Sequence, residues 1–121
     1  MQQTQMEDAA SAAPVLLQVG GYGSWTHRLR CEEAVIGRSA HSDIQVKNDD
    51  TVSRRHCRIV KQGPVWALVD VTSTNGTRVN GTTVGVVALH EGDRIEVGHS
   101  TFYFFEAEEN GVVDQWEDEA L

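Results

Sequence analysis

The sequence predicts an all-β fold, a sandwich of about ten short and mostly antiparallel strands. Three features of its 121 residues indicate this fold. Apolar and polar residues alternate in short runs, which is the period of a strand with one buried face. Glycine, proline, asparagine and aspartate separate those runs and mark turns. No helical stretch is long enough to cover a sheet, so two sheets must cover each other.

The first two strands are predicted at 14–19 and 25–30, joined by a glycine-rich turn. On one face of the first strand lie Val15, Leu17 and Val19. A glycine-rich loop after a strand is also found in dinucleotide-binding proteins. That loop must lead into a helix whose N-terminus faces the phosphate, whereas residues 25–30 alternate again. The sequence therefore predicts a hairpin turn.

Eight further strands are predicted between the turns that follow. Their ranges are 34–36, 44–46, 56–61, 65–70, 77–79, 86–89, 94–97 and 101–105. Asn75-Gly76 and Asn80-Gly81 are strong turn signals on either side of the strand at 77–79. In the strand at 56–61, Cys57 and Ile59 share a face. Trp25 and Trp66 are interpreted as packing residues rather than as platforms for a ligand.

The net charge of −8 arises from acidic residues at the two ends of the chain, outside the predicted strands. Seven acidic residues lie at 106–121 and two within the first 13, so residues 14–105 hold nine acids against all ten lysines and arginines. Direct binding of nucleic acid needs a larger positive excess and is not expected. No apolar run approaches the roughly eighteen residues of a membrane span, so no membrane partner is expected.

Composition divides the chain into three parts. Residues 1–13 are small, polar and without periodicity, which predicts a disordered N-terminal segment. Residues 14–106 contain the predicted strands and form one folded domain. Residues 107–121 are acidic and predict a solvated tail or linker.

Cysteine and histidine usage indicates an intracellular protein, nuclear or cytoplasmic, without a metal or cofactor. Cys31 and Cys57 form no CxxC and lie in separate strand-like segments, so we expect reduced, partly buried thiols. The five histidines show no metal-ligand spacing among themselves or with the cysteines. The first residues lack the basic start and apolar core of a secretory signal.

Three short polar clusters lie within residues 37–81. They are Gly37-Arg38, Ser53-Arg54-Arg55-His56 and Ser73-Thr74-Asn75-Gly76. Cationic and hydroxyl side chains in loops on a β scaffold suit the capture of a phosphate group. The residues by themselves therefore predict an anion site in the loops of the sandwich.

Ser53 and His56 also suggest the serine–histidine pair of a hydrolase. No glycine turn forms a nucleophile elbow around Ser53. In a strand, residues three positions apart would also point to opposite faces. We therefore favour a structural His56 bonded to loop backbone, and expect no catalytic residue and no enzymatic activity.

The ordered set of motifs closely resembles the forkhead-associated (FHA) family over residues 14–106. The matching pieces are Gly37-Arg38, Asp43-Ile44, Val52-Ser53-Arg54-x-His56-x-x-Ile59, Ser73-Thr74-Asn75-Gly76-Thr77-x-Val79-Asn80-Gly81 and Leu89-x-x-Gly92-Asp93-x-Ile95. Each piece alone is a weak signal, but their order and spacing are specific. The resemblance implies an eleven-stranded β-sandwich with its ligand site in the loops at one end. It also implies a signalling module that binds phosphothreonine in partner proteins and catalyses nothing.

The resemblance implies roles for individual residues. Arg38 matches the phosphate-binding arginine, and Ser53 matches a hydroxyl donor to the same phosphate. Arg54 matches a contact to phosphate or peptide backbone, and Thr74 matches a further phosphate-side contact. Asn75 matches the residue whose amide binds the main chain of the ligand. The positions that hold the loops in shape are matched by Gly37, His56 and Gly76.

Two further hypotheses concern the partner. A sandwich of this kind could instead bind an unphosphorylated protein surface after losing phosphate recognition. Thr4, once phosphorylated, would dock in the site of a neighbouring copy and cause weak self-association. The resemblance does not extend to the choice of residues around the phosphothreonine, because the loops that make this choice vary in the family.

Overall fold

The computed structural model describes residues 13–20 and 23–106. This part of the chain forms eleven strands and contains no helix, hence none that could cross a membrane. The predictions of a disordered segment, of an acidic tail and of docking through Thr4 concern residues outside the described ranges. The strands are β1 (Val15–Gly20), β2 (Gly23–Arg28), β3 (Glu33–Gly37), β4 (Ile44–Gln45), β5 (Cys57–Gln62), β6 (Val65–Asp70), β7 (Thr77–Val79), β8 (Thr82–Val84), β9 (Val86–Ala88), β10 (Arg94–Val97) and β11 (Ser100–Phe105).

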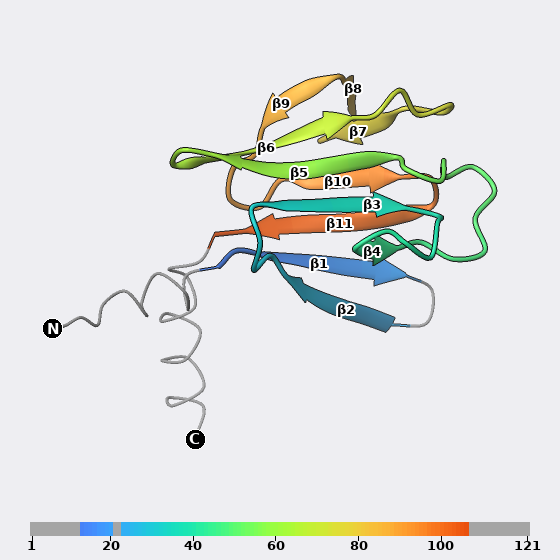
Figure 1. The fold of residues 1–121 in the computed structure, drawn as a ribbon, viewed down its shortest axis with the longest axis horizontal. Coiled ribbons are helices and arrows are strands. Elements are labelled where there is room, and N and C mark those ends of the chain that lie inside the picture. The colour runs from blue at the N-terminus through green and yellow to red at the C-terminus, as the bar shows by residue number, and fades with distance from the viewer. Residues whose placement is uncertain (1–12, 21–22, 107–121) are drawn as a thin grey trace, which may run out of the picture.

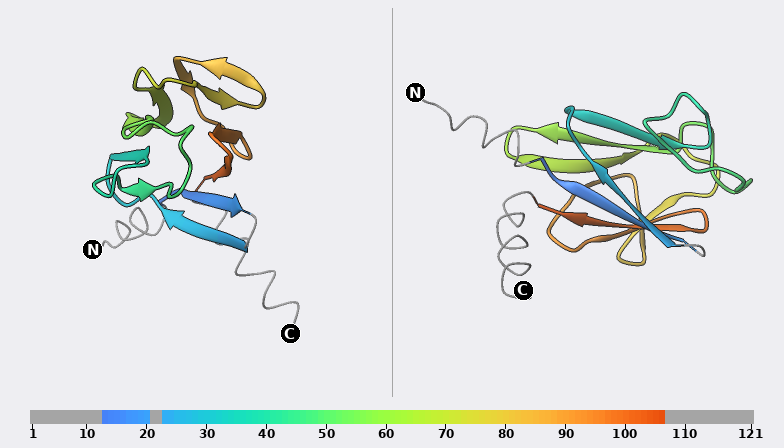
Figure 2. Two further views of the ribbon diagram at one scale, coloured as in Figure 1. Left: turned by 90° about the vertical axis from the view of Figure 1, so that its right-hand side faces the viewer. Right: turned by 90° about the horizontal axis from the view of Figure 1, so that it is seen from below.

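Two sheets pack face to face, as the right-hand view of Figure 2 shows. The larger sheet has the order β2-β1-β11-β10-β7-β8, and the smaller has the order β4-β3-β5-β6-β9. Neighbouring strands are antiparallel except β3 and β4, which pair in parallel. The all-β sandwich predicted from the sequence is therefore confirmed.

The prediction omitted one strand, β8. Its residues include a single apolar side chain, so they show no strand-like alternation. The Asn80-Gly81 turn reverses the chain so that β8 pairs with β7, and Val79 lies directly opposite Thr82 on either side of the turn. Both turn residues have positive φ, 53° and 87°, which is the backbone of a type I′ hairpin.

The core lies between the sheets and is closed by the aromatic residues of β11. Phe102 and Phe104 are fully buried, as is Leu16 of β1, which lies opposite Phe104. The face of β1 formed by Val15, Leu17 and Val19 is the outer one, and Val19 is 40% exposed. Because Leu16 and Leu17 are both apolar, alternation alone does not identify the buried face.

The two cysteines differ more than expected. Cys57 is completely buried, and this burial raises the pKa of its thiol to about 12. Cys31 is exposed and lies in the loop between β2 and β3, so the prediction of a partly buried strand residue is wrong. The neighbouring Leu29 takes the buried position, and its N–H donates to the Pro14 carbonyl at 2.8 Å.

The tryptophans also divide. Trp66 is buried in β6, as expected of a packing residue. Trp25 is 48% exposed, because β2 is an edge strand of the larger sheet. Its ring lies beside Gly20, where an added Cβ would be 3.3 Å from it.

The loops that carry the polar clusters gather at one end of the sandwich. The β3–β4, β4–β5 and β6–β7 connections and the β10–β11 turn all lie at the right-hand end of Figure 1. The described chain begins and ends at the opposite end. The scaffold therefore brings together segments that are separated by up to sixty residues in the sequence.

Candidate functional site

Ser53, in the β4–β5 loop, connects the three polar clusters. Its Oγ accepts a hydrogen bond from the Thr74 amide at 3.0 Å. Its carbonyl accepts one from the Arg38 amide, also at 3.0 Å. Because the Thr74 N–H occupies a lone pair of Oγ, the Ser53 O–H remains available to donate to a ligand.

The guanidinium of Arg38 is held by one of its own donors. Its Nε donates to the Val52 carbonyl at 2.9 Å. The two terminal amino groups, with four N–H donors between them, remain for a bidentate anion. The side chain is exposed but tethered, which lowers the entropy lost when it binds a ligand.

Asn75 and Thr74 present polar groups from the β6–β7 loop, which contacts the β4–β5 loop. The Asn75 Nδ2 donates to the Thr51 carbonyl at 3.0 Å, and Thr74 and Asn75 are both exposed. An amide group has two donors and one acceptor, so Asn75 retains a donor and its Oδ1 for a peptide main chain. Arg54 is exposed on the same loop as Ser53.

Gly37 allows the end of β3 to touch the β4–β5 loop. A Cβ at this position would lie 2.0 Å from the Arg54 carbonyl oxygen and 2.9 Å from the Ser42 Oγ. The Arg54 carbonyl also accepts hydrogen bonds from the Ser39 amide at 3.2 Å and from the Ser42 hydroxyl at 3.3 Å. Only glycine leaves room for this contact.

His56 is fully buried and joins the two loops on either side of the site. Its Nδ1 accepts from the Ser53 amide at 3.0 Å, and its Nε2 lies 2.8 Å from the Gly76 carbonyl. A carbonyl only accepts, so Nε2 carries the hydrogen. Gly76 itself has a φ of 87°, a conformation that favours glycine.

This geometry argues against the hydrolase alternative for a reason that the sequence did not supply. β5 begins at Cys57, so Ser53 and His56 are not strand residues and the argument from opposite faces does not apply. Instead, His56 uses its Nδ1 to bind the backbone amide of Ser53, while the Ser53 hydroxyl is bonded to Thr74. The imidazole is therefore engaged as a brace and not as a base for the hydroxyl.

Asp70, at the end of β6, is a supporting residue that sequence reasoning missed. Its carboxylate accepts from the Ser73 amide at 2.8 Å and from the hydroxyls of Ser73 and Thr77 at 2.7 Å each. The Ser73 Oγ accepts in turn from the Gly76 amide at 2.9 Å. The available signal was the local pattern of an aspartate three residues before a serine, which is typical of a capped turn.

We expect the Asp70→Asn variant to lose less stability than the wild type when the pH is lowered. Partial burial favours the neutral carboxyl, but hydrogen bonds from Ser73 and Thr77 outweigh it and lower the pKa of Asp70. A lowered pKa stabilises the fold above the ordinary value of 3.8, and this contribution disappears as pH falls through the folded pKa. At pH 7 the free energy of unfolding of the variant should be about 1–3 kcal/mol lower than that of the wild type. Below pH 4 it should fall less steeply with pH than that of the wild type.

Urea unfolding at a series of pH values from 7 to 2 measures this difference. Glu33→Gln is a suitable control, because Glu33 is an exposed partner of Arg58 at the far end of β3. A profile for Asp70→Asn that stays parallel to the wild type throughout the acid range would contradict the expectation.

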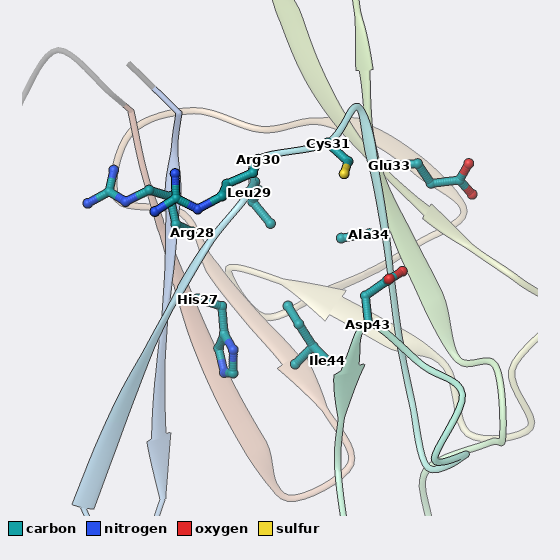
Figure 3. A pocket seen from close by; sticks show the side chains of 9 residues that line it. All are labelled: His27, Arg28, Leu29, Arg30, Cys31, Glu33, Ala34, Asp43 and Ile44. Atoms are coloured by element: carbon teal, nitrogen blue, oxygen red, sulfur yellow. The ribbon is translucent and has the colours of Figure 1, made fainter. Parts of the chain in front are cut away.

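Arg38, Ser53, Thr74 and Asn75 line neither of two hollows found on the surface. One of about 280 Å³ opens between β2 and β3, with Leu29, Ala34 and Ile44 around its middle. Figure 3 shows Arg28 and Arg30 extending to one side and Glu33 to the other, so its charges do not converge. A second, of about 680 Å³, lies along β1, β2 and residues 45–49 and reaches His99 and Ser100 at the β10–β11 turn. Because Arg38, Thr74 and Asn75 are exposed, the candidate site is an open loop surface, which suits a peptide better than a small molecule.

Across the described ranges, no three side chains of histidine, cysteine, aspartate or glutamate are placed to hold a metal ion. The clustered donors are instead amide, hydroxyl and guanidinium groups, which bind anions.

Known sequences similar to this chain share the same domain. The family model of the FHA domain matches residues 34–98. The FHA domain-containing protein FhaA of Mycobacterium tuberculosis is 41% identical over 92 residues, which are 75% of this chain and 17% of FhaA. The glycogen accumulation regulator GarA of the same species is 33% identical over 88 residues, 72% of this chain and 54% of GarA. The chain thus spans only about half of GarA and a smaller part of FhaA.

Solved structures agree with these sequences. One, from a structural and functional analysis of phosphothreonine-dependent FHA domain interactions, has a TM-score of 0.70 at 38% identity and covers 77% of this chain and 95% of that one. The FhaA FHA domain complexed with the intracellular domain of Rv3910 has a TM-score of 0.69 at 38% identity, with 76% and 99% covered. Mycobacterium tuberculosis EmbR in complex with a low affinity phosphopeptide has a TM-score of 0.73 at 29% identity, with 79% and 25% covered.

Proposed function

The chain belongs to the FHA-domain family, and on that premise we propose that residues 14–106 form a non-catalytic module that binds phosphothreonine in a partner protein. One observation carries the proposal. Ser53 is hydrogen-bonded to both Arg38 and Thr74, so the three polar clusters of the sequence form one surface. That surface offers guanidinium and hydroxyl donors at the exposed end of a rigid sandwich.

The phosphate group would bind between Arg38 and Ser53. A phosphothreonine carries a charge of about −1.5 to −2 near neutral pH, which suits a forked guanidinium. The Ser53 hydroxyl would donate to the same phosphate, and Arg54 and Thr74 would add contacts at its edge. Asn75 would hold the main chain of the peptide with the amide groups that Thr51 leaves unused.

The partner would be a phosphorylated protein in an intracellular signalling assembly, in the nucleus or the cytoplasm. Relatives of this chain were solved with a phosphopeptide or with an intracellular domain, which supports a partner of this class. The free thiols of Cys31 and Cys57 are consistent with a reducing compartment.

An amide NMR titration tests the proposal. We expect saturable shifts around Arg38, Ser53 and Asn75 with a degenerate phosphothreonine-peptide pool, and none with the matched unphosphorylated pool. A phosphoserine pool should bind more weakly, since it lacks the methyl group, whose burial by area contributes about 0.8 kcal/mol. Shifts that are the same with the unphosphorylated pool would indicate a phosphate-independent binding protein instead.

A further inference from the structure

Two adjacent carbonyls hold the side chains that are proposed to bind the ligand. The Thr51 carbonyl accepts from Asn75, and the Val52 carbonyl accepts from Arg38. Both carbonyls belong to the β4–β5 loop, outside the regular strands. The orientation of Arg38 and Asn75 therefore depends on what fixes this loop.

Asp49 fixes the loop through its side chain. This carboxylate is only 9% exposed and accepts from the Thr51 amide at 3.0 Å and from the Thr51 hydroxyl at 2.5 Å. Its other oxygen accepts from the His99 amide at 2.8 Å, and the His99 ring nitrogen Nδ1 lies 3.3 Å from Oδ1. Asp49 thus connects Thr51 to a turn that lies fifty residues further along the chain.

That turn is a rigid anchor for the carboxylate. Gly98 and His99 form the two-residue turn between β10 and β11, and Val97 and Ser100 on either side of it are paired. Gly98 has a φ of 60°, and a Cβ there would lie 2.5 Å from Val52 Cγ2 and 2.6 Å from Asp49 Oδ2. The turn and the β4–β5 loop are therefore in close contact, and two strands of the larger sheet hold the turn in place.

We propose that Asp49 is a positioning residue for the phosphopeptide site, which fixes the Thr51 and Val52 carbonyls against the β10–β11 turn and so orients Arg38 and Asn75. The inference rests on the proposed function. Asp49 suits this task because Thr51 and the His99 amide present only donors to it, which a carboxylate accepts on both oxygens. An asparagine would turn an N–H₂ group toward at least one of those donors.

A pair of substitutions at Thr51 separates positioning from bulk stability. Thr51→Val removes the hydroxyl that donates to Asp49 at nearly constant volume, and Thr51→Ser retains it. Asp49→Asn is the direct variant. Each protein is compared with the wild type by the Arg38 Nε–Hε signal in NMR without peptide, by phosphothreonine-peptide affinity, and by urea unfolding.

We expect the Arg38 Nε–Hε signal of Thr51→Val and Asp49→Asn to shift and to exchange faster with solvent. Their affinity for the peptide that binds best in the titration should fall roughly tenfold, which is the value of one lost hydrogen bond to a charged group. Thr51→Ser should keep the wild-type signal and affinity.

An unchanged Arg38 signal in a folded Thr51→Val protein would overturn the proposal, and so would equal losses in the valine and serine variants. If Asp49→Asn does not fold, the two Thr51 variants still decide. If the wild-type protein binds no phosphopeptide, the proposed function is wrong. The effect of Asp49 on the orientation of Arg38 is still tested, because the Arg38 signal is measured without ligand.

Discussion

Arg38→Ala should weaken phosphothreonine-peptide binding about a hundredfold while the protein stays folded. Each hydrogen bond to a charged group contributes roughly 1.5–3 kcal/mol, and a factor of ten corresponds to about 1.4 kcal/mol. Arg38 is exposed, so its removal leaves no cavity. Arg38→Lys should give an intermediate loss, because lysine keeps the charge but loses the fork and the bond from Nε to the Val52 carbonyl.

Isothermal titration calorimetry with the peptide identified by NMR measures both affinities. Arg58→Ala is a matched control, because it removes an equal charge from a residue of β5 that is not assigned to the site. Arg58 forms an ion pair with Glu33, which lies at the end of β3 remote from the site. An Arg38→Ala protein that binds as tightly as Arg58→Ala would refute the assignment of Arg38 to the phosphate.

Gly37→Ala should cause a large loss of stability. The added methyl group would overlap the Arg54 carbonyl oxygen, which is backbone and cannot rotate away. Relief requires the β4–β5 loop to move from the end of β3, and this would break the bonds that the Arg54 carbonyl accepts from Ser39 and Ser42. Overpacking of this kind costs about 1–3 kcal/mol, and peptide binding should fall with it because Ser53 lies on the same loop.

Gly85→Ala provides the control for this prediction. A Cβ at Gly85 meets nothing within 4 Å, so its effect should stay within about 0.5 kcal/mol. Thermal and urea unfolding of the two variants measure the difference. Equal stabilities would show that the contact at Gly37 does not constrain the loop.

Local signals in the sequence determined much of the fold. β7 and β10 occupy the predicted ranges 77–79 and 94–97, because turn residues on either side set their limits. The Asn80-Gly81 turn has the predicted hairpin form, since its backbone requirements lie within four residues. Such features need no knowledge of the remainder of the chain.

Features that depend on neighbouring strands were less predictable. The buried face of β1 is set by Phe104 across the pair, and the exposure of Trp25 by the position of β2 at a sheet edge. Likewise, the exposure of Cys31 follows from where β2 ends. Alternation reports that a residue is in a strand but does not report what covers it.

The polar clusters of the candidate site could be chosen from the sequence because their order and spacing resemble the FHA motifs, and Ser53 joins them in the structure. The carboxylates that support these clusters could not be chosen from the sequence. Asp70 is the polar last residue of a predicted strand and Asp49 lies between two predicted strands, yet one organises the β6–β7 loop and the other is buried against a turn fifty residues away. The chain by itself therefore determined the sandwich and predicted the side chains that are proposed to face the ligand. Only the tertiary structure decided which carboxylates position them, because a buried acid is stabilised by donors that folding brings to it.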